Sequence, residues 1–213
     1  MKKHRNLIAV ILTLLLIGCA VGIFLLVDSV RKEKQADDFF AVERPFNFDE
    51  DTDRDSELAQ KLLDEYKTVW FFDGNAYSLR NKQVLVKTNL QTGEEEELYR
   101  DDDGIDMMYL EPEMAYIKKG TSLYRFHLPT QILEKVFTDE GFNWFRPISN
   151  IKVEVHILTP QYVKYVQETG DKENLHGIPM VNQYELNVNT GEMVEIKEML
   201  GNPERVWTSS HII

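Results

Sequence analysis

The densest group of side chains that could do chemistry is the acidic stretch Asp101-Asp102-Asp103-Gly104-Ile105-Asp106. Hard divalent cations take clustered carboxylate oxygens as ligands, so Asp101, Asp103 and Asp106 are candidates for a calcium site. A solvated turn is the other interpretation, because Asp and Gly are common turn residues. The sequence favours the turn, and calcium is the weaker of the two hypotheses.

The other polar residues form no pattern that a known reaction requires. The histidines are too far apart for a local metal motif such as H-E-x-x-H, and the nucleophile elbow G-x-S-x-G is absent. Two carboxylates at the separation that glycoside hydrolysis needs cannot be identified. We therefore expect no cofactor and assign no catalytic residue. The histidines considered are His127, His156, His176 and His211.

Three tryptophans, Trp70, Trp144 and Trp207, lie near the first strand of a predicted unit or near the predicted closing strand. Aromatic side chains at these places could line a carbohydrate-binding or peptide-binding surface. We favour core packing, because large aromatic residues are mostly buried in sheets.

The only cysteine, Cys19, lies inside an uncharged run from Leu7 to Val27. Residues Leu16-Ile17-Gly18-Cys19 resemble the lipobox of bacterial lipoproteins, which implies lipidation of Cys19 after cleavage. The apolar run continues past Cys19, however, and at about 1.5 Å per helical residue it reaches about 31 Å, close to the thickness of a bilayer core. We therefore prefer an uncleaved transmembrane signal anchor over residues 7–27, with lipidation as the alternative.

The residues before this run predict its orientation. Lys2, Lys3 and Arg5 precede it, and positive charges beside a first span tend to stay in the cytoplasm. Residues 1–6 are then a cytoplasmic tail, and everything after Val27 is extracytoplasmic at the cell membrane. No cysteine follows the anchor, so the external domain can hold no disulfide.

Length and composition indicate one folded domain behind the anchor. The chain has 213 residues, of which 43% are hydrophobic, and this is enough for one core. Its formal net charge is −12. Such an acidic surface repels phosphate backbones, which argues against nucleic acid as a partner.

Two segments separate the anchor from the main domain. Residues 28–55 are expected to form an acidic, solvated stalk, and their phenylalanines leave a docking segment as the alternative. Residues 56–66 predict a short helix that Asp55 or Ser56 can cap, and we expect it to pack as a plug against the sheets. Residues 67–213 form the remaining all-β domain.

From Lys67 onward the apolar residues recur with a period of two, which is typical of strands. Two sets of four strands are predicted, and the stretches 153–158 and 162–167 are interpreted as part of an inserted hairpin. The predicted strands are 68–73, 75–79, 84–90, 95–100, 106–110, 114–118, 122–128 and 132–138, with a closing strand at 204–208.

The two sets of strands are copies of one another. Segment 85–93 aligns without a gap on segment 123–131, a shift of 38 residues. A third copy includes Tyr184, which falls on Val86 and Tyr124. A four-strand unit that repeats near about 40 residues is the signature of a β-propeller blade.

These repeats resemble the blades of bacterial membrane-anchored extracytoplasmic propeller proteins, a broad group mostly of unknown function. Their repeats read apolar-Tyr-Arg-x-x-Leu-x-Thr-Gly. The resemblance covers roughly residues 67–196 and implies four-stranded antiparallel blades, hairpin turns at the Thr-Gly corners, and binding through loops at one end of the blades. We count three to four blades, so whether the ring closes is left open by the sequence. An incomplete ring has open edges that could recruit partners or form oligomers.

The function expected from these features is that of a membrane-anchored binding or interaction module of the cell envelope. We favour a non-catalytic role, with an envelope protein or a wall-associated ligand as partner. Two alternatives remain open. One is an envelope hydrolase or its accessory domain, and the other is a sensor subunit that acts through a membrane partner.

Overall fold

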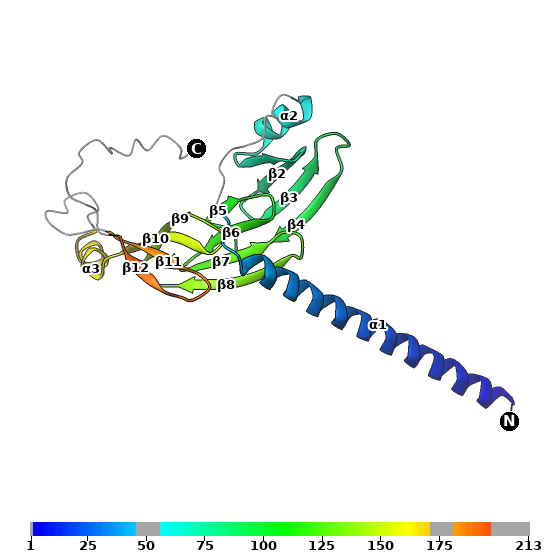
Figure 1. Ribbon diagram of the computed structural model, residues 1–213. Coiled ribbons are helices and arrows are strands. Elements are labelled where there is room, and N and C mark those ends of the chain that lie inside the picture. Colours follow the sequence, from blue (N-terminus) through cyan, green and yellow to red (C-terminus); the bar gives the residue numbers. More distant parts are fainter. Residues whose placement is uncertain (1, 46–55, 171–180, 197–213) are drawn as a thin grey trace. The chain divides into compact units, whose positions relative to one another are not determined.

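The computed structural model describes residues 2–45, 56–170 and 181–196, and within its helices the side chains of residues 2–16, 163, 165 and 167 are not described. The chain divides into two compact units, Met1–Val42 and Glu43–Ile213. Figure 1 shows a single long helix in the first unit and antiparallel sheets in the second.

Helix α1 (Lys2–Phe40) makes up nearly all of the first unit and is 39 residues long. It continues through residues 28–40, which we expected to be a solvated tether. The helical conformation of this segment has a physical reason, because extending an existing helix needs no new nucleus and Lys, Glu, Gln and Ala are good helix formers. Asp28 and Lys32 also form an i,i+4 ion pair, with 3.0 Å between Oδ2 and Nζ.

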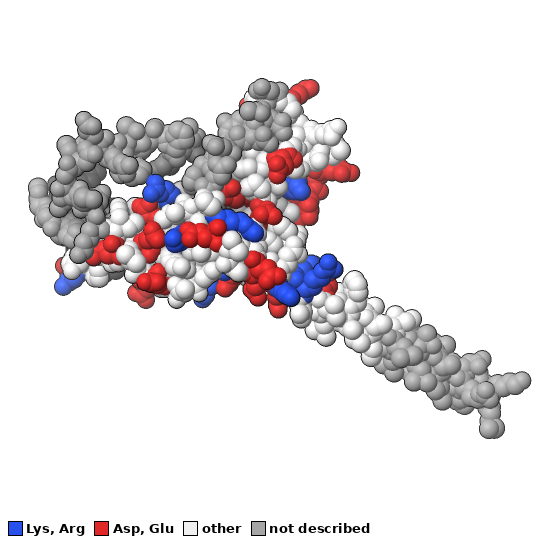
Figure 2. Space-filling view, viewed as in Figure 1, with Lys and Arg blue, Asp and Glu red and all other residues white. Residues whose placement is uncertain are grey.

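The described side chains of α1 present a large apolar surface. Exposed fractions reach 70% at Phe24 and 69% at Leu26. Figure 2 shows the described apolar part of the helix in white, without charged side chains. The predicted membrane span is not supported, since no helix within the described residues is both long enough and apolar enough to cross a bilayer.

Residues 43–45 belong to the second unit and pair with a turn far along the chain, at 149–152. The backbone N–H of Arg44 donates to Asn150 Oδ1 at 2.6 Å. The N–H of Asn150 donates in return to the Arg44 carbonyl at 3.0 Å. We call this pairing the clasp.

Two further contacts complete the clasp. Pro45 forms an antiparallel bridge with Ser149, and Glu43 Oε1 lies 3.2 Å from Lys152 Nζ. Residues 43–45 of the predicted stalk are therefore docked on the third blade of the same chain. The rest of the stalk, residues 46–55, lies outside the described residues.

Helix α2 (Glu57–Glu65) lies at the position predicted for the plug. Its N-cap is Ser56, whose Oγ accepts the backbone N–H of Ala59 at 3.1 Å. The helix buries Ala59 and Leu62 in a cluster with Phe71 of the first sheet. It thereby covers one face of that sheet.

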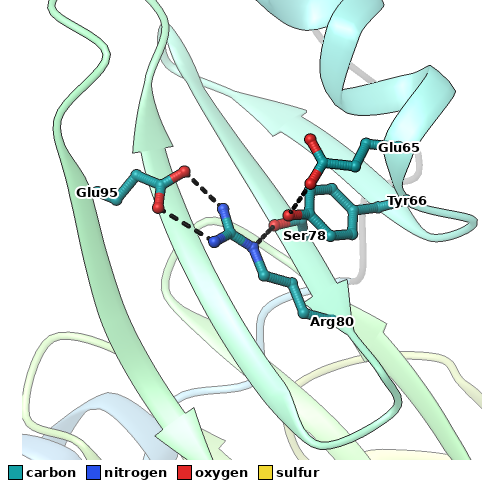
Figure 3. A network of polar contacts seen from close by, with 5 residues as sticks. All are labelled: Glu65, Tyr66, Ser78, Arg80 and Glu95. Atoms are coloured by element: carbon teal, nitrogen blue, oxygen red, sulfur yellow. Dashed lines mark hydrogen bonds and ion pairs between the residues drawn. The ribbon is translucent and has the colours of Figure 1, made fainter.

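Arg80 joins the end of α2 to the same sheet (Figure 3). Its guanidinium donates two hydrogen bonds to Glu95, of 2.6 and 3.1 Å, and its Nε donates to Ser78 Oγ at 3.2 Å. The guanidinium also lies over the Tyr66 ring, 4.8 Å from the centroid, and the Tyr66 hydroxyl donates to Glu65. The hydrogen bond from Arg80 lowers the pKa of Glu95, so this ion pair persists into mild acid.

Three four-stranded antiparallel sheets form the second unit, and in each the neighbouring strands are consecutive in the chain. Both predicted sets of strands are confirmed, with bounds within about one residue of those expected. The first blade comprises β1 (Val69–Phe72), β2 (Asn75–Arg80), β3 (Val84–Asn89) and β4 (Glu95–Arg100). The second comprises β5 (Met107–Leu110), β6 (Met114–Lys119), β7 (Ser122–His127) and β8 (Ile132–Thr138).

The third blade comprises β9 (Phe142–Pro147), β10 (Lys152–Leu158), β11 (Val181–Asn187) and β12 (Met193–Glu195). Its insertion is a helix, α3 (Pro160–Thr169), so the hairpin predicted to include 162–167 is corrected. The reason is local capping, because Thr159 Oγ1 accepts the Tyr162 N–H at 3.2 Å, Pro160 occupies the first turn and Gly170 ends the helix with φ of 68°. The predicted closing strand at 204–208 lies outside the described residues.

The turn between the third and fourth strands has one design in all three blades. In the first blade, Asn89 Oδ1 accepts the N–H groups of Gln91 and Thr92, both at 2.9 Å. Asn187 repeats this arrangement in the third blade, and in the second blade His127 Nδ1 lies 2.7 Å from Thr130 Oγ1. The last turn residue has positive φ in every blade, namely Gly93 at 74°, Gln131 at 57° and Gly191 at 73°.

These turns allow a matched test. Gly93→Ala should destabilise the protein by about 1 kcal/mol, because a Cβ meets no neighbour there but the left-handed backbone disfavours it. Gln131→Ala is the control, since this position already holds a Cβ in the left-handed region and should change stability by only a few tenths of a kcal/mol. Urea denaturation would measure both. Equal losses for the two variants would contradict the explanation.

The first two blades share a core. Trp70, Leu79 and Tyr99 of the first blade and Tyr124 of the second pack against its edge, partly buried. Trp70 is therefore a packing residue, as the core interpretation expected. The buried members are Phe72, Tyr77, Leu85, Leu98, Ile105, Met108, Leu110, Ala115, Ile117, Phe126 and Leu128.

The second and third blades meet through aromatic rings and one polar contact. Phe145 of β9 is fully buried, with its ring centroid 5.2 Å from that of Tyr109 and 6.3 Å from that of Tyr116. Nearby, Arg125 Nη1 donates to Asn189 Oδ1, in the last turn of the third blade, at 2.6 Å. The first and second blades thus each use one face to contact the blade that follows.

Candidate interaction face on the third blade

Side chains on the third blade alternate between two faces. Phe145, Val153, Val155 and Leu186 point to one side, and all are at most 1% exposed. The other side carries two rows of cross-strand neighbours, which we call the terminal face. One row is Arg146, Glu154, Glu185 and Val194, and the other is Trp144, His156, Gln183 and Ile196.

The repeat shows what the terminal face corresponds to in the other blades. The comparison uses paired positions on the second and third strands of each blade. Tyr77 pairs with Lys87 in the first blade, and Tyr116 pairs with Arg125 in the second. Both pairs lie on the face that contacts the following blade. The equivalent pair in the third blade is Glu154 with Glu185, a few ångströms apart as direct cross-strand neighbours.

No fourth sheet follows β12 in the described part of the chain. The terminal face therefore occupies the place of a blade-to-blade interface, with charged residues where the first two blades carry a tyrosine and a cation. By contrast, α2 covers the corresponding free face of the first blade through Ala59 and Leu62. An open end of a repeat array normally needs such a polar or capped surface.

Glu154 is the electrostatic centre of the terminal face. Its side chain is 10% exposed and binds two groups, Arg146 Nη2 at 2.5 Å and His156 Nε2 at 2.8 Å. Trp144 packs against the His156 ring with centroids 4.6 Å apart. These contacts hold Glu154 and Trp144 in fixed positions on the sheet, which is what a preformed recognition surface needs.

The outer part of the terminal face is more exposed. Val194 is 57% exposed and Ile196 is 38% exposed. Both lie on or beside β12, the edge strand of the blade. An edge strand with exposed apolar side chains is a site at which other chains can bind.

The structure does not gather the calcium candidates into one site. Asp106 Oδ2 accepts the Gly120 N–H at 2.6 Å and lies 3.6 Å from Lys118 Nζ. Asp101 instead binds Lys119. Across the described ranges, no three His, Cys, Asp or Glu side chains converge as metal ligands would.

Asp101 is a structural residue of the turn that joins the first two blades. It is 8% exposed, and its Oδ2 accepts the Tyr99 hydroxyl at 2.8 Å while its Oδ1 accepts the Asp103 N–H at 3.1 Å. Burial alone would raise the pKa of Asp101, but the hydrogen bonds from Lys119 and Tyr99 outweigh it and lower that pKa. Burial, followed by the bond to Asp101, raises the pKa of the Tyr99 hydroxyl.

The remaining candidates from the sequence fall at separate places. Cys19 is a free, exposed cysteine of α1. His127 is buried in the turn of the second blade, and burial lowers the pKa of its imidazole. Trp207, His176 and His211 lie outside the described residues.

The sequence singled out Trp144 and His156 as separate candidates, and it did not predict that they lie beside Arg146 and Glu154. A signal was available, because Glu154 and His156 alternate with Val153 and Val155 in a strand. In the repeat alignment, Glu185 also falls on the cations Lys87 and Arg125. A charge of opposite sign at an interface position could have indicated that this face differs from the interfaces between the described blades.

Comparisons with known proteins add no family. No protein-family model and no curated protein matches this chain. Among solved structures, the N-terminal domain of Nup159 aligns with a TM-score of 0.39 and 12% identity over 61% of this chain and 29% of that domain's chain. Oligogalacturonate lyase from Vibrio parahaemolyticus aligns with a TM-score of 0.43 and 14% identity, over 58% of this chain and 35% of the lyase.

A third solved structure, the tricorn protease, aligns with a TM-score of 0.41 and 12% identity. The alignment covers 58% of this chain and 12% of the protease. This chain therefore spans about a third or less of each of these proteins. The propeller-like architecture rests on the three sheets themselves and on their repeated turns.

Proposed function

We propose that this protein is a membrane-anchored, extracytoplasmic interaction module that binds a protein partner of the cell envelope through the terminal face of its third blade. The role is non-catalytic. The observation that carries the proposal is the pair Glu154 and Glu185, which occupies the position of a blade-to-blade interface at the end of the described sheets.

The surface of the terminal face suits protein recognition. It combines a fixed aromatic ring, Trp144, with an ordered ion pair between Arg146 and Glu154. Exposed Val194 adds an apolar contact at the edge. Aromatic and arginine side chains are the residue types that contribute most to protein interfaces.

The proposal includes a membrane anchor because of the sequence and the exposed apolar side chains of α1. The uncharged run from Leu7 to Val27 lies within this helix, and basic residues precede it. Its described part exposes a row of large apolar side chains, of which Phe24 is the most exposed. Surfaces of this kind need a lipid or protein environment.

A sensor subunit is the second candidate, and the clasp favours it. The segment that follows α1 binds the 149–152 turn, which joins β9 to β10. These two strands carry Trp144 and Glu154 of the terminal face. A partner bound there would therefore act on strands that are tied to the segment following α1.

Site-specific photo-crosslinking in intact cells tests the proposed function. A photoreactive amino acid placed at Val194 of the full chain should yield one recurring adduct with another protein, because this side chain is 57% exposed on the terminal face. The matched control is Leu63, an apolar residue of α2 that is 40% exposed. The same adducts at both positions, or adducts only within or between copies of this chain, would refute a dedicated partner site.

A further inference from the structure

The terminal face has one carboxylate that the rest of the sheet does not neutralise. Glu154 and Glu185 are direct cross-strand neighbours, and like charges in this arrangement repel. Arg146 and His156 both bind Glu154. For Glu185, the described residues provide neither an ion pair nor a hydrogen bond to the carboxylate.

The second blade shows how this position makes contact across an interface. Arg125, which aligns with Glu185, donates to Asn189 of the third blade at 2.6 Å and pairs with Glu134 at 2.7 Å. At this interface the second blade supplies the positive charge, and the third blade supplies the hydrogen-bond acceptor. Glu185 carries a negative charge at the aligned position, so a molecule bound to the third blade must supply the donor.

The surroundings of Glu185 indicate what accompanies that donor. Val194 is its direct neighbour on β12, and Ile196 lies in the adjacent row. Both side chains are exposed, at 57% and 38%. A partner that neutralises Glu185 will therefore also cover apolar surface.

We propose that the partner of the terminal face is a basic, partly apolar protein segment, which places a Lys or Arg side chain against Glu185 and an apolar side chain against Val194. This inference rests on the proposed function and names the chemistry of the partner. Charge complementarity carries it, because the third blade presents an unpaired carboxylate at a position where the second blade presents a cation. A glycan without charge would leave that carboxylate unneutralised.

Two matched synthetic peptides test the proposal on the full-length chain in an uncharged detergent. One alternates valine and lysine, and the other alternates valine and glutamate. The lysine peptide should bind and the glutamate peptide should not, and added salt should weaken the binding. Glu185→Lys should weaken it by about tenfold or more, because it places like charges together.

Glu195→Lys is the control, because it makes the same change in net charge on the neighbouring strand β12. Glu195 is exposed and pairs with Tyr184, so its side chain lies on the opposite face from Glu185 and Val194. It should leave the affinity within about twofold. Equal losses for the two variants would mean that the peptide responds only to the overall charge of −12, and would overturn the proposal.

The peptide and crosslinking experiments separate the two proposals. A protein adduct at Val194 together with no preference for the lysine peptide would overturn the partner chemistry and leave the interaction module standing. The absence of a specific adduct at Val194 would refute the proposed function itself. Lysine-peptide binding that survives Glu185→Lys but is lost in Val194→Asp would replace charge recognition with apolar recognition, which also overturns the inference.

Discussion

Phe145→Ala should destabilise the second unit by about 3–5 kcal/mol and separate the third blade from the second. Phe145 is fully buried, and its ring meets those of Tyr109, Tyr116 and Phe142 with centroids 5.2–6.3 Å apart. Truncation removes the side chain that joins these rings and leaves a cavity that a rigid sheet cannot fill. Urea denaturation followed by tryptophan fluorescence measures the loss, because Trp144 is the adjacent residue.

The control for this prediction is Asn143→Ala. Asn143 lies on the same strand but is exposed, so its truncation should change stability by no more than about 0.5 kcal/mol. A Phe145→Ala variant with an unchanged urea midpoint would show that the aromatic contact does not hold the two blades together.

Asp101→Ala should cost about 2–3 kcal/mol, the second largest effect expected. The substitution removes the acceptor for the Tyr99 hydroxyl and the Asp103 N–H, and it leaves the Lys119 charge without its partner. Asp139 provides the comparison, because it occupies the same place in the turn after the second blade. Its Oδ1 accepts the Gly141 N–H at 2.7 Å, and no cation pairs with it among the described residues. Asp139→Ala should therefore cost only about 1 kcal/mol.

The Asp101 contribution should depend on pH in one direction. Its pKa is lowered in the folded state from the ordinary 3.8, so its stabilising effect is complete above that value and is lost as the pH falls through the lower folded pKa. The stability difference between the parent chain and Asp101→Ala should thus be constant near neutrality and shrink in acid. Urea denaturation at a series of pH values would measure it, and a difference that grew in acid would contradict the assignment.

Much of the fold could be predicted because the sequence repeats. Alternating apolar residues located the strands, and the shift of 38 residues between segments such as 85–93 and 123–131 revealed the blade. The helix at 160–169 was missed because its Val and Tyr residues resemble a strand pattern. Thr159, Pro160 and Gly170 decided the outcome through capping, which is a local effect that periodicity does not register.

The candidate site was harder to predict because it depends on which face of a strand is left open. Trp144, Arg146, Glu154 and His156 are ordinary strand residues in the sequence, and only the sheet register makes them neighbours. The acidic stretch at 101–106 suggested a calcium site because its carboxylates are neighbours in the sequence, although the fold does not bring them together. Its carboxylates are close in sequence, but Asp101 and Asp106 face different lysines of β6.

The clasp has a mechanical consequence. A pull transmitted along the chain from α1 reaches residues 43–45 before it reaches α2 or the first blade. These residues are held because Arg44 is hydrogen-bonded to Asn150 and Pro45 forms an antiparallel bridge with Ser149. Tension is therefore delivered first to the turn between β9 and β10. The contacts that hold residues 43–45 would have to break before any load passed to the first blade. The third blade therefore bears tension before the first blade does.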